Sequence, residues 1–245
     1  MLAHKASDPI LLYFVLLQYS QSMAMLKSSP AFLVLAFAFF LCFIMSNGSY
    51  VYFQFVQQWP PTNCRVRIKR PCSSPRPLQY FTIHGLWPSN YSNPRMPSNC
   101  TGPQFKRILS PQLRSKLQTS WPDVESGNDT KFWESEWNKH GTCSKETLNQ
   151  MQYFERSYAM WMSYNITEIL KNASIVPHPT QTWKYSDIVA PIKAATKRTP
   201  LLRCKQDKNT VLLHEVVFCY EYNALKQIDC NRTSGCQNQP AISFQ

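Results

Sequence analysis

Two stretches decide how this chain folds and what chemistry it can carry: FTIHGLWP at residues 81–88 and KFWESEWNKHGTC at residues 131–143. Each stretch holds one of the five histidines in the chain, and each surrounds it with aromatic residues and a glycine. In the second stretch, Lys139 and His140 follow Glu136 by three and four residues, so a helix would bring all three near one face. A base, a cation and a carboxylate on one rigid element, joined by a second histidine, predict acid–base cleavage of a phosphodiester.

The residues around His84 predict that it lies at the end of a strand. Gly85 lets the backbone approach a neighbour closely, and Trp87-Pro88 is expected to turn the chain at once. Aromatic and β-branched residues predict strands at residues 50–56, 78–83 and 211–222.

The rest of the chain combines helices with these strands. Strands and helices do not alternate strictly, which favours an α+β fold over a doubly wound sheet. Residues 89–103 are rich in Asn, Ser and Pro and are expected to form a surface loop. The predicted helices are residues 131–140, capped by Asp129 or Thr130 and ended by Gly141; one begun by Ser110-Pro111; residues 149–170 as one long helix; and one opened by Ser186-Asp187 and interrupted or kinked at Pro191.

The protonation of His140 follows from its expected place at a helix C-terminus. The helix dipole and Glu136 favour the charged imidazole, whereas Lys139 opposes it, so the pKa of His140 is expected between weakly acidic and neutral pH. His178, which stands between prolines, and His214, within a predicted strand, are interpreted as hydrogen-bonded packing residues.

The N-terminal region predicts a secretory leader. Residues 31–45 are 15 residues without a charge, with Lys27 before them and small residues after them. A membrane span needs about 20 apolar residues, so a signal peptide is the better interpretation. We therefore expect residues 1–48 to be an extension and signal peptide, and residues 49–245 to be a single secreted domain.

Cysteine usage and charge agree with an extracellular protein. Of nine cysteines, Cys42 lies in the apolar leader, and the other eight predict four disulfides whose pairing the spacing leaves open. A net charge of +12 suits a polyanionic partner, although a soluble basic surface has the same composition. Acceptor motifs for N-glycosylation stand at Asn90, Asn99, Asn128, Asn165, Asn172 and Asn231.

Other catalytic motifs do not fit the sequence. The zinc-protease motif needs a histidine on either side of its glutamate, but Ser135 precedes Glu136 and Lys139 occupies the second position. Paired Cys-x-x-Cys ligands, serine-nucleophile elbows and Gly-Lys-Ser/Thr phosphate loops are also absent from the sequence. We therefore predict no metal site.

The two histidine stretches resemble the active-site signatures of the ribonuclease T2 family, and VYFQFVQQWPPTNC at residues 51–64 resembles its first strand. The resemblance extends from about Tyr50 to the C-terminus. The sequence is most similar to the plant S-ribonucleases, the pistil proteins of gametophytic self-incompatibility. Within this group it most resembles the rosaceous, Prunus-like members. It implies a single α+β domain with a mainly antiparallel central sheet packed with helices.

The same resemblance implies an endoribonuclease that cleaves single-stranded RNA to 2′,3′-cyclic phosphates without a cofactor or metal ion. His140 would be the general base and His84 the general acid, while Glu136 and Lys139 would stabilise the phosphorane. Many members have a histidine where Ser135 stands, which implies weaker phosphate binding here. The implied substrate-binding residues are Gln58, Trp87, Asp123, Val124, Phe132 and Ser135, and the implied disulfides are Cys64–Cys72, Cys100–Cys143, Cys204–Cys236 and Cys219–Cys230.

The biological role has alternatives at this point. An S-ribonuclease would be a secreted monomer of the style with a pollen-side recognition protein as partner and no membrane contact after signal cleavage. Related plant ribonucleases with the same motifs serve phosphate scavenging or defence. A catalytically silent RNA-binding or storage glycoprotein on the same scaffold is a third alternative.

Overall fold

The computed structural model describes residues 50–66, 72–73, 77–91, 96–107, 110–233 and 235–245. The expected signal peptide lies outside these described residues. Within them, none of the helices combines the length and the apolar character needed to cross a membrane.

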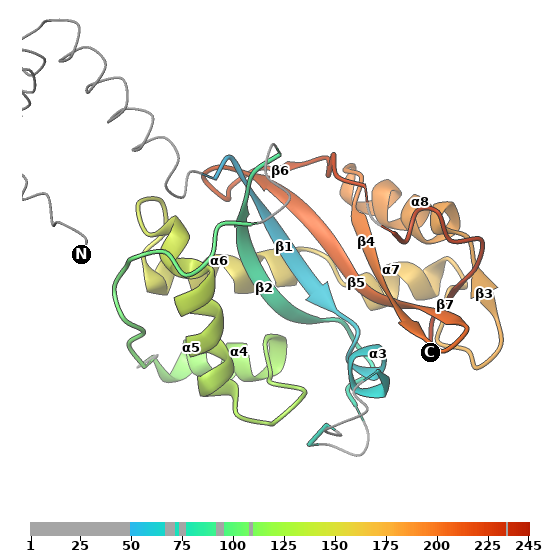
Figure 1. Cartoon of the computed structure of the whole chain (residues 1–245), viewed down its shortest axis with the longest axis horizontal. Coiled ribbons are helices and arrows are strands. Elements are labelled where there is room, and N and C mark those ends of the chain that lie inside the picture. Colours follow the sequence, from blue (N-terminus) through green and yellow to red (C-terminus); the bar gives the residue numbers. More distant parts are fainter. Residues whose placement is uncertain (1–49, 67–71, 74–76, 92–95, 108–109, 234) are drawn as a thin grey trace, which may run out of the picture. The chain divides into compact units, whose positions relative to one another are not determined.

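A mainly antiparallel sheet forms the centre of the fold. Strand β1 (Tyr52–Gln58) pairs antiparallel with the edge strand β2 (Thr82–Ser89) on one side and with β5 (Thr210–Glu221) on the other (Figure 1). Strand β5 also pairs antiparallel with β4 (Leu201–Asp207) and β6 (Gln227–Ile228) and parallel with β7 (Ile242–Ser243), which pairs with β3 (Thr182–Trp183). The α+β prediction is confirmed, with one parallel pair in the sheet.

Helices pack around this sheet, and their bounds correct several predictions. They are α3 (Pro60–Arg65), α4 (Pro111–Ser120), α5 (Asp129–Lys139), the 3₁₀ helix η1 (Gly141–Ser144), α6 (Gln150–Ser163), α7 (Ile166–Asn172) and α8 (Tyr185–Thr196). In Figure 1, α4 and α5 lie beyond the β2 edge of the sheet, and α8 lies near β4.

Three of the helix predictions were wrong in detail. The long helix expected over residues 149–170 is two helices, because Tyr164 is extended and Asn165 caps a new helix through its side chain. Pro191 lies inside α8 without ending it. The cap of α5 is Asn128 rather than Asp129 or Thr130, and it accepts a hydrogen bond from the Lys131 backbone N–H.

Buried indoles connect the helices to the strand that carries the first histidine. Trp133 on α5 donates to the backbone carbonyl of Trp121, and Trp121 donates to the backbone carbonyl of His84, at 2.8 and 3.0 Å. Both indole rings are buried. This chain of bonds fixes β2 relative to α5, so the two histidine stretches hold a defined relationship.

The structure contains the four disulfides Cys64–Cys72, Cys100–Cys143, Cys204–Cys236 and Cys219–Cys230. These are the pairs that the family resemblance implies. Cys143 lies in η1, directly after α5, so the second disulfide ties the loop after β2 to the end of the helix that precedes His140. The backbone N–H of Asn99 adds a 2.7 Å hydrogen bond to the Lys139 carbonyl at the same place.

Candidate active site

His84 is the extra residue of a β-bulge, and not the last residue of a strand. Val56 pairs with Gly85 and Gln57 with Ile83, so His84 has no opposite residue on β1. Strand β2 continues through Pro88 to Ser89, because an edge strand tolerates a residue without a backbone N–H. Bulges re-aim a side chain, and this one turns the imidazole out of the regular alternation of the sheet.

A buried glutamate holds the His84 ring. Nδ1 of His84 lies 2.6 Å from Oε1 of Glu215, and Nη1 of Arg203 lies 3.0 Å from Oε2 of the same carboxylate. The Glu215 side chain is 4% exposed, whereas 29% of the His84 side chain is exposed. The three residues come from β5, β2 and β4, so sheet register assembles them.

Charge sets the protonation of this pair. Burial lowers the pKa of His84, but the hydrogen bond to Glu215 and the charges of Glu215 and Glu136 outweigh it and raise the pKa above its ordinary value. Burial raises the pKa of Glu215, yet His84, His214 and Arg203 together hold it well below its ordinary range. The arrangement therefore favours an imidazolium beside a carboxylate.

Sequence reasoning missed both Glu215 and Arg203. The available signal was Glu215 within the apolar stretch VLLHEVVF at residues 211–218, because a buried charged residue needs a partner. Its neighbour His214 is buried, with Nε2 placed 3.3 Å from the Asn63 side chain, in keeping with its interpretation as a packing residue.

Trp87 stands between the two histidines. Its ring centroid lies 5.0 Å from that of His84 and 5.1 Å from that of His140. The indole N–H donates to Oε2 of Glu136 at 2.9 Å. Gly85 permits this bond, because a side-chain carbon at that position would collide with both the indole nitrogen and the Glu136 carboxylate. Burial raises the pKa of Glu136.

His140 is more buried than the sequence predicts. It is the C-cap of α5, only 3% of it is exposed, and its Nδ1 has no hydrogen-bond partner among the described residues. Burial, with the charges of Lys139 and His84, lowers its pKa to about 3, against a smaller opposing effect of the Pro97 backbone. The expectation of titration near neutral pH was wrong, because desolvation outweighs the helix dipole.

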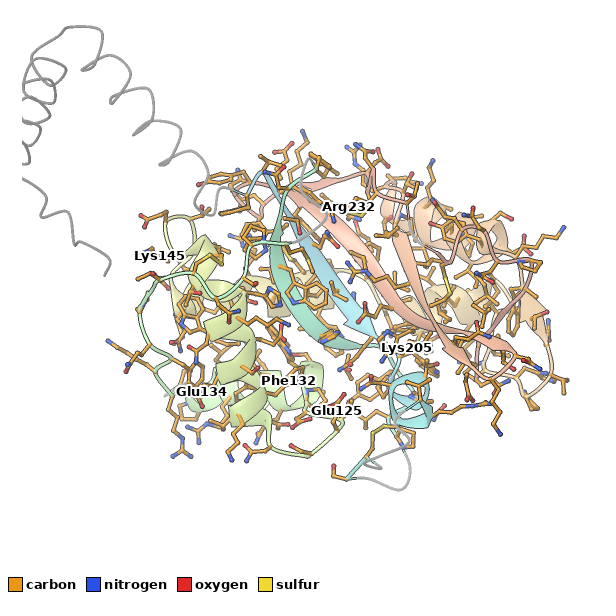
Figure 2. All side chains as sticks on the ribbon, viewed as in Figure 1. Glu125, Phe132, Glu134, Lys145, Lys205 and Arg232 are labelled. Carbon is orange, nitrogen blue, oxygen red and sulfur yellow. A yellow bond between two sulfur atoms is a disulfide. The ribbon has the colours of Figure 1, made fainter. Side chains whose placement is uncertain are left out.

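A pocket of about 320 Å³ opens beside His84. Figure 2 shows Phe132 on α5 and Glu125 in the preceding turn on the same side of the molecule, towards α3. Six sequence-predicted site residues line this pocket, together with Glu125 and Lys131: Gln58, His84, Asp123, Val124, Phe132 and Ser135.

The other predicted residues do not line this pocket. Trp87, Glu136 and His140 are buried, and Lys139 is exposed at the end of α5. The Asp123 carboxylate accepts hydrogen bonds from the backbone N–H groups of Glu125 and Ser126, so its side chain shapes the turn at the pocket wall. Among the described residues, no three His, Cys, Asp or Glu side chains converge as metal ligands would.

Comparison with known proteins finds relatives that align with most of this chain. The chain is 38% identical over 183 residues to Ribonuclease MC from Momordica charantia, covering 74% of this chain and 94% of that protein. It is 36% identical over 195 residues to Ribonuclease S-6 from Pyrus pyrifolia, covering 77% and 83%. The crystal structure of an RNase MC1 variant in complex with 5′-GMP superposes with a TM-score of 0.73 at 35% identity, over 80% of this chain and all of that one.

The pattern that defines the Ribonuclease T2 family matches residues 50–230, from the start of β1 to beyond β6. The match includes both histidine stretches, the bulge at His84 and the Glu215 strand. The chain therefore belongs to the ribonuclease T2 family.

Proposed function

We propose that this chain is an endoribonuclease that cleaves single-stranded RNA by transesterification, with His84 as general acid and His140 as general base. The observation that carries the proposal is the orientation of His84. Its Nδ1 faces the buried Glu215, so Nε2 is the ring atom left for a substrate, at the wall of an open pocket.

The acid step follows from the charge around His84. An imidazolium held by Glu215 gives its Nε2 proton to the 5′-oxygen as the P–O bond breaks. The Glu215 carboxylate compensates the positive charge before the reaction, and Arg203 keeps that carboxylate ionised. A positioned proton transfer of this kind contributes about 10²–10⁴-fold to the rate.

The base step requires a neutral imidazole, which burial supplies at His140. The 2′-hydroxyl gives its proton to this ring while its oxygen bonds to phosphorus, and a 2′,3′-cyclic phosphate results. A phosphate bound beside the ring brings negative charge, which raises the pKa of His140 and strengthens it as a base. Because His140 is buried in the free protein, the base step requires its ring to become accessible when the substrate binds.

The remaining residues counter the charge of the phosphorane or bind the RNA. Lys139 is exposed next to His140 and can counter the charge of the phosphorane. Glu136 was expected to stabilise the phosphorane, but we propose that it positions Trp87, since it is buried and accepts the indole hydrogen bond. Ser135 offers a hydroxyl but no charge at the pocket wall. Phe132 is half-buried there, and an aromatic face stacks on any base with about 1–3 kcal/mol, which suits single-stranded RNA of varied sequence.

We also propose that the protein is secreted and acts as a pistil self-incompatibility ribonuclease. The 15-residue apolar leader, the four disulfides and the similarity to Ribonuclease S-6 support this role. Transcripts confined to the style would agree with it, whereas induction in leaves by phosphate starvation would assign the enzyme to nutrient recovery.

The reaction is tested with a panel of the sixteen RNA dinucleotides. The expected products are a nucleoside 2′,3′-cyclic phosphate and a nucleoside with a free 5′-hydroxyl. The matched controls are the same dinucleotides with a 2′-O-methyl group or with deoxyribose, which should remain intact in the presence of a chelator. Cleavage of the 2′-O-methyl substrates would rule out the 2′-hydroxyl as nucleophile.

A further inference from the structure

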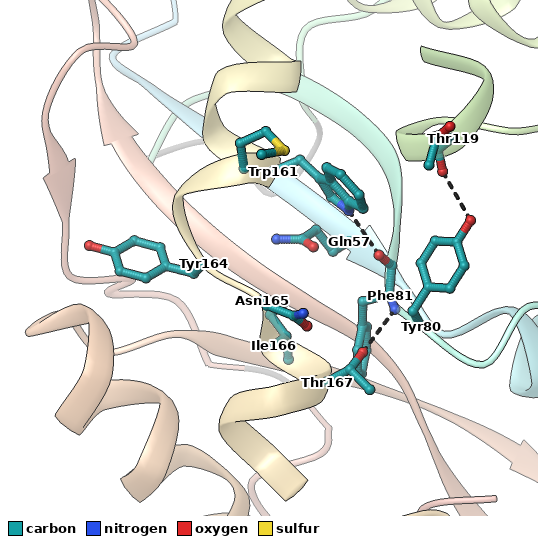
Figure 3. A pocket seen from close by; sticks show the side chains of 10 residues that line it. Gln57, Tyr80, Phe81, Thr119, Trp161, Tyr164, Asn165, Ile166 and Thr167 are labelled. Atoms are coloured by element: carbon teal, nitrogen blue, oxygen red, sulfur yellow. Dashed lines mark hydrogen bonds between the residues drawn. The ribbon is translucent and has the colours of Figure 1, made fainter. Parts of the chain in front are cut away.

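A second pocket, of about 520 Å³, lies apart from the site described above and shares no lining residue with it. Its walls are Gln57 on β1, Tyr80-Phe81 before β2, Thr119 on α4 and the junction between α6 and α7, residues 161–167 (Figure 3). Gln57 and Gln58 are adjacent on β1 and point to opposite faces of the sheet, so Gln57 lines this pocket and Gln58 lines the pocket beside His84.

The walls of this pocket combine aromatic rings with one unpaired amide. Trp161 donates to the Phe81 carbonyl at 2.9 Å and Tyr80 to the Thr119 carbonyl at 3.2 Å, so their polar atoms already have partners (Figure 3). Gln57 differs, because it is 1% exposed and its Nε2 has no hydrogen-bond partner among the described residues. A buried donor without an acceptor is unfavourable, which points to a polar ligand in this pocket.

An attachment point for such a ligand lies on the pocket wall. Asn165 begins the acceptor motif Asn165-Ile166-Thr167, is exposed, and lines the pocket. Its Oδ1 accepts a 3.2 Å hydrogen bond from the Glu168 backbone N–H, as the cap of α7. The cap uses the oxygen of the amide and leaves Nδ2, the atom to which an N-linked sugar is joined, available.

We propose that this pocket holds the first sugar, a 2-acetamido hexose, of an N-linked glycan on Asn165. Transfer forms a bond between Asn165 Nδ2 and the anomeric carbon, while the diphosphate of the lipid-linked donor leaves and the amide loses one proton. In the folded protein an oxygen of the sugar accepts from Gln57 Nε2, and its C–H face lies on Trp161 or Tyr80. Attachment to the wall gives the sugar a high effective concentration at these partners.

The inference rests on secretion as part of the proposed function, but not on RNA cleavage. The protein is secreted from a eukaryotic host fed with isotope-labelled N-acetylglucosamine, and occupancy of Asn165 is read by mass spectrometry. An endoglycosidase then trims each glycan to one sugar. The acetamido methyl of the sugar on Asn165 is expected to show nuclear Overhauser contacts to Trp161 and an upfield ring-current shift.

Two variants separate the effect of the sugar on Tm from the effect of the helix cap. Asn165→Asp removes the glycan but keeps an oxygen that caps α7, and Asn172→Asp removes a glycan at the exposed end of the same helix. We expect Asn165→Asp to lower Tm by about 2–4 °C and Asn172→Asp to leave it unchanged. Gln57→Leu should lower Tm in the glycosylated protein and raise it in the Asn165→Asp background, where the unpaired donor has no acceptor.

Three results would overturn the assignment: an unoccupied Asn165, a glycan without contacts to Trp161, or equal effects of Gln57→Leu in both backgrounds. RNA cleavage is measured on the same samples. Protein that shows the sugar contacts but cleaves no RNA would refute the nuclease proposal and leave this one standing.

Discussion

The Nδ1 atom of His84 lies 2.6 Å from Oε1 of Glu215, although 131 residues separate the two in the sequence. Strand β1 lies between their strands, so the contact reaches across one strand of the sheet. In the proposed mechanism, this contact keeps a proton on the partly exposed imidazole for transfer to the leaving group. The carboxylate that keeps this proton is buried and is itself paired with Arg203.

Glu215→Gln should shift the alkaline limb of the kcat/KM profile to lower pH. Glutamine has the same shape but no charge, and the pKa of His84 is raised by the Glu215 carboxylate, so its loss lets His84 release its proton earlier. The measurement is the pH profile of dinucleotide cleavage for variants with unchanged Tm. Glu221→Gln, on the same strand but partly exposed and paired with Lys226, is the control and should not move the profile.

His84 and His140, which we propose as general acid and general base, should each contribute about 10²–10⁴-fold to kcat. His84→Ala and His140→Ala test these roles separately. The double variant should lose less than the product of the two losses, because residues that act as a unit are not additive. His178→Ala is the control, since that side chain is exposed and accepts hydrogen bonds from the backbone of its own turn at Thr180 and Gln181. Activity near that of the control in either single variant would refute the assigned role.

Stability should fall as the pH decreases from about 6.5, the ordinary pKa of histidine. Burial lowers the pKa of His140 to about 3 and that of His214 to about 4. Between these values and the unfolded pKa, the unfolded chain binds more protons than the native one, so acid favours unfolding. Urea unfolding at pH 7 and pH 4.5 measures the difference in the free energy of unfolding. His140→Asn and His214→Asn should each reduce this difference. An unchanged difference in both variants would contradict the burial argument.

Gly85→Ala should impair both folding and catalysis. The added carbon would collide with the indole nitrogen of Trp87 and the carboxylate of Glu136, which are hydrogen-bonded to each other. Overpacking of this kind costs about 1–3 kcal/mol, and the displaced indole also contacts both histidine rings. Gly235→Ala is the control, because no atom lies within 4 Å of the added carbon there. Equal Tm and kcat in the two variants would mean that Trp87 can move freely.

Loss of the Cys100–Cys143 disulfide should lower stability by about 2–5 kcal/mol and should also lower kcat. This bond holds the loop after β2 against the end of α5, next to His140. The double variant Cys100→Ser/Cys143→Ser is compared with Cys204→Ser/Cys236→Ser, which opens the disulfide between β4 and the segment after β6. Both are assayed at a temperature where the variants are fully folded, and only the first should lose activity beyond its stability effect.

The sequence by itself identified the residues whose relationships are local. Lys139 and His140 follow Glu136 by three and four residues, and the glycine after His140 predicts where their helix ends, although its cap is Asn128 and not Asp129 or Thr130. The Ser110 cap followed by Pro111 was correct for the same reason. Local spacing fixes such features because neighbouring residues on a helix meet whatever the rest of the chain does.

Tertiary structure alone decided the partners of those residues. Glu215 and Arg203 reach His84 through strand register, and the bulge that frees His84 from the ladder comes from how β1 and β2 align. The sequence also could not predict the burial of His140, because desolvation depends on atoms that distant segments bring close to the ring. Contacts between distant segments set the charge and exposure of the site, whereas the sequence set which side chains are present there.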